Sequence, residues 1–106
     1  LPYIDQNNGG DIYGMINAMN YIINVADEES KIVPGHGKVS GMKEIRTYRD
    51  MLTSIRNKTI QLAREKKTEE EIILIMDTFI KQEKGVSSNK DFIFHVLKMV
   101  QKHERI

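Results

Sequence analysis

The sequence contains no cysteine, and this absence removes several classes of site from consideration. Disulfide bonds, thiolate nucleophiles and cysteine-based zinc sites all need a residue type that the chain lacks. The absence leaves the cellular compartment open.

Long apolar runs and an excess of one charge are also missing. No segment approaches the roughly 18 consecutive apolar residues that span a bilayer, and the first residues are polar and glycine-rich, unlike a signal peptide. Sixteen lysines and arginines nearly balance fifteen aspartates and glutamates in a chain of 106 residues. We therefore expect a single small domain with neither a membrane nor a nucleic acid as its partner.

Two long stretches have the apolar spacing of amphipathic helices. The first follows the turn-forming residues 5–11, and we expect it to end near Ala26, before the acidic residues 27–29. The second is predicted from about Gly41 to Lys66, with the preceding serine as its N-cap.

Two shorter helices are predicted in the C-terminal part of the chain. Thr68 and Glu71 have the spacing of a capping box, and the helix that they open is expected to end at Gly85. Residues 88–91 open the last helix. The inward positions predicted for the four helices are Ile12, Met15, Ile16, Met19, Ile22, Ile23, Ala26, Ile45, Tyr48, Leu52, Ile55, Thr59, Leu62, Ile72, Ile75, Met76, Phe79, Ile80, Phe92, Ile93, Val96, Leu97 and Val100.

The segment between the first two helices has a different character. Residues 31–33 are predicted to form a short strand, because Val33 precedes Pro34 and a residue before proline favours extended geometry. Three residues later His36 stands between two glycines, which permit a tight loop. These features predict a mainly α chain of about four helices with one short strand at 31–33.

His36 has two interpretations when the loop is considered alone. A neutral imidazole on a short, exposed loop can bind a metal ion such as zinc. The same residue can also be an ordinary polar residue of a turn.

The order of the motifs resembles the C-terminal part of the metallo-β-lactamase-fold hydrolases. The resemblance is carried by "PYID" and "NGGD" within residues 2–11, by the sequence Pro34-Gly35-His36-Gly37, and by "YRDML" at residues 48–52. Residues 1–66 match this pattern better than residues 67–106, which resemble the helical tail of such proteins.

The resemblance implies that residues 1–106 form one segment of an αββα sandwich, whose first two helices lie on a sheet. It implies that His36 is a zinc ligand, while Pro34 and the two glycines shape its loop. The family's main metal motif, His-x-His-x-Asp-His, does not occur in this chain, which begins at Leu1. We therefore expect a C-terminal fragment of a zinc-dependent hydrolase that is inactive alone and that binds zinc in the complete protein.

The other two histidines are predicted to have structural roles. His95 lies within the last helix, on its surface or partly buried, and His103 lies near the end of that helix, where it can interact with the helix dipole. Neither is expected to complete a metal site with His36.

The missing sheet leads to an expectation about partners. Apolar helix faces left in water are costly, at roughly 25 cal/mol per Å². We expect these faces to be buried against one another, against a second copy of the chain or against the missing N-terminal segment, so that the chain forms a homo-oligomer or depends on a partner. The alternative function is a non-enzymatic helical oligomerisation or interaction module that retains only the ancestry.

Overall fold

The computed structural model describes residues 11–32, 41–84 and 89–106. These residues form four helices, α1 (Ile12–Ile32), α2 (Met42–Arg64), α3 (Glu69–Lys84) and α4 (Lys90–Glu104). The prediction of a mainly α chain with four helices is thereby confirmed. None of the four helices is both long enough and apolar enough to cross a membrane.

The predicted strand at 31–33 is wrong for its first two residues. Lys31 and Ile32 form the last turn of α1, which continues well past Ala26. Residues 26–31 include Ala, Glu and Lys, which favour helix, and a helix satisfies its backbone groups internally, whereas a lone strand needs a neighbour. Val33 lies outside the described residues.

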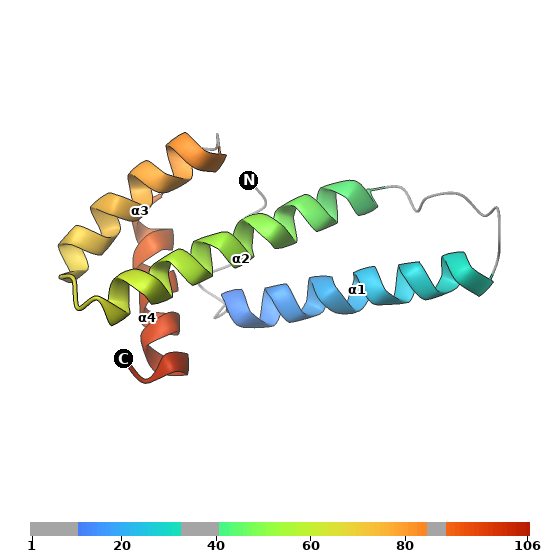
Figure 1. The fold of residues 1–106 in the computed structure, drawn as a ribbon, viewed down its shortest axis with the longest axis horizontal. Helices are drawn as coiled ribbons and strands as arrows, with labels where there is room; N and C mark the ends of the chain where they lie inside the picture. The colour runs from blue at the N-terminus through green and yellow to red at the C-terminus, as the bar shows by residue number, and fades with distance from the viewer. Residues whose placement is uncertain (1–10, 33–40, 85–88) are drawn as a thin grey trace.

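The helices are arranged around α2, which packs against each of the other three. Helices α1 and α2 run antiparallel side by side, and α3 and α4 gather around the C-terminal half of α2 (Figure 1). The molecule is therefore elongated, with extents of 51 × 28 × 26 Å. The end of the α1–α2 pair that contains the C-terminus of α1 and the N-terminus of α2 lies away from α3 and α4 (Figure 1).

A single buried cluster joins the four helices. Thr59 is a buried polar residue of α2, and its hydroxyl donates to the carbonyl oxygen of Ile55 at 2.8 Å, so that the group is satisfied within the helix. The predicted inward faces of α2, α3 and α4 all contribute. The members of the cluster are Ile12, Ile16, Leu52, Ile55, Leu62, Ala63, Ile72, Met76, Ile80, Ile93, Val96, Leu97 and Val100.

Helix ends follow the sequence signals in two of the described cases. The Thr68 hydroxyl accepts from the Glu71 amide at 3.1 Å, and the Glu71 carboxylate accepts from the Thr68 amide at 2.9 Å, which confirms the capping box. Asn89 caps α4 by accepting from the amides of Asp91 and Phe92. At the start of α2 the cap position belongs to Gly41, with φ of 86°, and the predicted cap Ser40 lies outside the described residues.

The turn between α2 and α3 is short and contains a residue in an unusual conformation. Lys66 has φ of 61°, in the left-handed region that favours glycine. Its amide donates to the Ala63 carbonyl oxygen at 3.0 Å, so the turn completes the C-terminal hydrogen bonds of α2.

Candidate functional site

The predicted metal ligand lies outside the described residues. His36, with Pro34, Gly35 and Gly37, belongs to residues 33–40, which follow the end of α1 and precede Gly41. Within the described ranges 11–32, 41–84 and 89–106, no three histidine, aspartate or glutamate side chains come together in a way that could hold a metal ion.

The other two histidines occupy different environments on α4. His95 is partly buried, and its Nε2 atom is buried without a hydrogen-bond partner among the described residues. His103 lies in the last turn of α4, where its Nε2 is 3.3 Å from Oδ2 of Asp11. The described part of the chain gives neither histidine a metal site.

Residues from both ends of the described chain meet beside His103. The Tyr13 ring stacks on the His103 ring, with centroids 4.0 Å apart and planes at 16°. The Tyr13 hydroxyl donates to Oε2 of Glu104 at 3.0 Å, and Arg64 donates to Oε1 of the same carboxylate at 2.9 Å. This group, completed by Asp11, links the N-terminus of α1 to the C-terminus of α4.

The environment of Tyr13 changes its titration. The pKa of the Tyr13 phenol is raised to about 12, mainly by burial and next by the hydrogen bond to Glu104. The phenol is therefore a hydrogen-bond donor throughout the neutral pH range. Its bond to Glu104 links α1 to α4.

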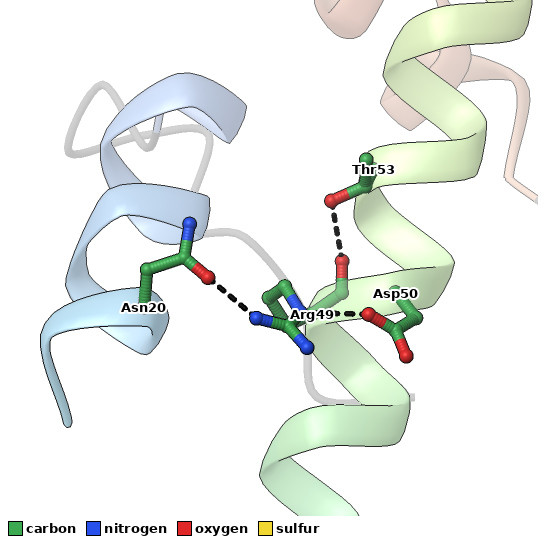
Figure 2. A network of polar contacts seen from close by, with 4 residues as sticks. All are labelled: Asn20, Arg49, Asp50 and Thr53. Atoms are coloured by element: carbon green, nitrogen blue, oxygen red, sulfur yellow. Dashed lines mark hydrogen bonds and ion pairs between the residues drawn. The ribbon is translucent and has the colours of Figure 1, made fainter. Parts of the chain in front are cut away.

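A second polar network joins α2 to α1 through Arg49. The Arg49 guanidinium donates from Nη1 to Oδ1 of Asn20 and from Nε to Oδ1 of Asp50, both at 2.7 Å (Figure 2). The Thr53 hydroxyl donates to the Arg49 carbonyl oxygen at 2.8 Å. Arg46 makes a parallel contact from α2 to α1, with Nη2 2.6 Å from Oδ1 of Asp27.

The exposed surface of α1 between residues 12 and 26 carries large apolar side chains beside Asn17 and Asn24. Residues 12–26 contain no charged side chain. Tyr21 is 71% exposed, Ile22 45% and Val25 37%, and Gly14 and Ala18 are exposed beside them. We call Gly14, Ala18, Tyr21, Ile22 and Val25 the outer face of α1. A surface helix normally carries charged residues opposite its buried stripe, so this face has the composition of a contact surface.

Sequence reasoning missed the partners of Tyr13 and Arg49. Tyr13 and Glu104 are 91 positions apart, and Asn20 and Arg49 are 29 positions apart, so no local pattern marks either pair. The prediction that Ile22 faces inward is wrong, because the side chain is exposed on the outer face.

Comparison with known proteins adds no relative: no family model, no curated protein and no solved structure matches this chain.

Proposed function

We propose that this chain is the C-terminal part of a metallo-β-lactamase-like, zinc-dependent hydrolase, and that His36 supplies one zinc ligand in the complete protein. The observation that carries the proposal is the sequence Pro34-Gly35-His36-Gly37, placed between two long helices that pack against each other. The combination of a proline, two glycines and one imidazole suits a short loop that presents a ligand nitrogen.

The outer face of α1 supports the same proposal from a different direction. An uncharged helix face suits a helix that packs between two layers, and the proposed parent supplies such a layer as a sheet. The exposed residues of α2 are all polar or charged, which suits a helix covered on one side only. The pair α1–α2 would then be a helical layer with one further apolar surface to cover.

The described residues do not form a zinc site, so no reaction step follows from them. One imidazole does not hold zinc in a preformed geometry, because catalytic zinc sites use three protein ligands. We therefore propose that the lone chain is inactive, and its substrate class stays open among lactams, thioesters, phosphoesters and other esters.

The test is the zinc content of the full-length gene product after dialysis against metal-free buffer. We expect the wild-type protein to retain zinc and His36→Ala to retain less. His103→Ala is the matched control, because it removes an imidazole that contacts Asp11 and Tyr13. Equal zinc content in wild type and His36→Ala would refute the role of His36.

A second candidate function is a helical oligomerisation module that retains only the ancestry. The observation that favours it is again the outer face of α1, which a second copy of the chain can cover. The two candidates differ in the sequence upstream of Leu1. A His-x-His-x-Asp-His motif encoded there supports the hydrolase, and its absence supports the oligomerisation module.

A further inference from the structure

The outer face of α1 has the spacing of a coiled-coil seam. Ile16 and Ile23 are buried and mark the side of α1 that packs into the protein. The residues two positions before and after each of them lie about 200° around the helix, on its opposite side. These four residues are exposed and are separated by four, three and four positions, so they align along one stripe. We call this stripe the seam: Gly14, Ala18, Tyr21 and Val25.

The seam has small residues in its first half and large residues in its second half. Gly14 does not have a positive φ that would require glycine. A Cβ added to it would meet, among the described residues, the Cβ of Asp11 at an ordinary distance of 3.8 Å. Glycine within a helix is less favourable than alanine. The described chain therefore gives no internal reason for a glycine here, and the absent side chain leaves space for an atom of another molecule.

A second copy of α1 in antiparallel orientation fits this division of size. Gly14 of one copy then lies opposite Val25 of the other. Ala18 lies opposite Tyr21, because both pairs are symmetric about the middle of the seam. Each large side chain thus meets a small residue in both halves of the interface, as a knob meets a hole. In a parallel pair each residue would face its own copy, which leaves a gap at Gly14 and crowds the two Tyr21 rings.

The residues beside the seam also favour the antiparallel orientation. Helical spacing places Asn17 and Asn24 along one side of the seam, and Met15 and Ile22 along the other side. Reversing the second helix exchanges its two sides, so each side of the seam meets the same side of the second copy. Asparagine amides then meet amides, and apolar side chains meet apolar side chains. Since residues 12–26 contain no charged side chain, the pairing brings no like charges together along the seam.

We propose that the outer face of α1 is the interface of an antiparallel homodimer with two-fold symmetry, in which the small half of each seam receives the large half of the other. This inference rests on the oligomerisation module, the second candidate function, and adds to it the orientation and the contacts of the two copies. Because α2 runs beside α1 (Figure 1), the two copies of α1 lie in the middle of the dimer, with α2 of each copy packed behind them.

The orientation is tested by disulfide formation between copies. The chain has no cysteine, so Gly14→Cys and Val25→Cys can each be introduced alone into the full chain, and the two variants mixed under mild oxidation. We expect the mixed disulfide to exceed the share given by random collision, as measured by mass spectrometry, because a disulfide forms only between residues that lie close together. Leu74→Cys, exposed on α3, replaces Val25→Cys in the control and should give only the random share.

The packing is tested by changing the size of the residue at position 14. Gly14→Leu fills the space assigned to Val25 of the second copy, so we expect it to raise the dissociation constant of the dimer by about tenfold or more. Sedimentation velocity over a range of concentrations measures this change. Gly14→Leu combined with Val25→Ala makes room again and should recover much of the association. Asn57→Leu, which places a leucine at an exposed position of α2, is the matched control and should associate as the wild type does.

The outcomes distinguish this inference from the candidate function on which it rests. If the wild-type chain remains a monomer at the highest concentration measured, both the oligomerisation module and the dimer are rejected. If the chain associates but disulfides between identical positions predominate, the antiparallel orientation is overturned and the oligomerisation module stands. Association of Gly14→Leu that equals that of the wild type overturns the proposed packing in the same way.

Discussion

Helices α1 and α2 are antiparallel neighbours of similar length, 21 and 23 residues, but their exposed surfaces have opposite compositions. The exposed positions of α2 are Lys43, Glu44, Thr47, Asp50, Asn57, Gln61 and Arg64. Those of α1 between residues 12 and 26 are Gly14, Asn17, Ala18, Tyr21, Ile22, Asn24 and Val25. One helix has a single buried stripe, and the other has an apolar surface on two sides.

The difference indicates which helix is incomplete by itself. Helix α2 packs against α1, α3 and α4, whereas α1 packs mainly against α2. Stability of the chain should therefore depend on α2 and its neighbours, and association should depend on the outer face of α1. The substitutions below test this division, in order of their expected effect on the free energy of unfolding.

The largest effect is expected on the inward side of α2. Leu52 is completely buried in the cluster, so Leu52→Ala should lower the free energy of unfolding by about 2–5 kcal/mol through lost burial and a residual cavity. Urea denaturation followed by circular dichroism measures the loss. Leu74→Ala is the control, because Leu74 is exposed on α3 and should cost within about 0.5 kcal/mol. Similar losses at both positions would contradict the proposed core.

The next effect is expected at the start of α3, where the cap is formed by residues close together in the sequence. Thr68→Ala removes the hydroxyl that accepts from the Glu71 amide and should cost about 1 kcal/mol. Thr68→Ser keeps a hydroxyl and should cost less.

The same cap predicts a pH dependence. The backbone hydrogen bond from Thr68, followed by the bond from its side chain, lowers the pKa of Glu71 below 4.5. The resulting stabilisation is present above pH 4.5 and is lost as the pH falls through the lowered value. The difference in the free energy of unfolding between wild type and Glu71→Gln should therefore become smaller as the pH falls. A difference that grows in acid would contradict the hydrogen bonds of this cap.

A smaller effect is expected where α1 meets α4. Tyr13→Phe removes the hydrogen bond to Glu104, and we expect a loss below about 1 kcal/mol because the groups are partly exposed. The pKa of Tyr13 is raised to about 12, mainly by burial, so its contribution is complete below pH 10 and is lost as the pH rises through about 12. The difference in tyrosinate absorbance between wild type and Tyr13→Phe measures this titration. Ionisation of Tyr13 near pH 10 would contradict the contact.

The smallest effect on unfolding is expected on the outer face of α1. Tyr21→Lys with Val25→Lys should change the free energy of unfolding of the separated chain by no more than about 0.5 kcal/mol per site. We expect the wild-type chain to self-associate and this double variant to do so much less, as measured by sedimentation velocity over a range of concentrations. Leu74→Lys introduces the same charge on α3 and should leave association unchanged. A wild-type chain that stays monomeric at high concentration would contradict the expectation.

Local signals predicted most of the fold. The spacing of Leu52, Ile55, Thr59 and Leu62 identifies the inward side of α2, and all four are buried. The capping box at Thr68 needs only four consecutive residues, and it is present. Such features depend on neighbours in the sequence, so a single sequence is enough to predict them.

The errors occur where local preference and packing disagree. Ile22 belongs to a helix that is apolar on two sides, so periodicity does not select a single inward stripe. The strand at 31–33 is expected because Val33 precedes Pro34, but Lys31 and Ile32 continue α1, and no neighbouring strand is available to them in the described chain. The same distinction applies to the candidate functional residues. The His36 motif can be found in a few consecutive residues, whereas the hydrogen bond from Arg49 to Asn20 forms only when two helices pack.

The left-handed Lys66 has a consequence for the order of folding. Four residues separate the end of α2 from the start of α3, and the turn through Lys66 brings the two helices together with little loss of chain entropy. Contacts between sequence neighbours of this kind form on fast timescales. We expect the α2–α3 pair to form early, and Lys66→Gly, which relieves the left-handed backbone, should accelerate that step.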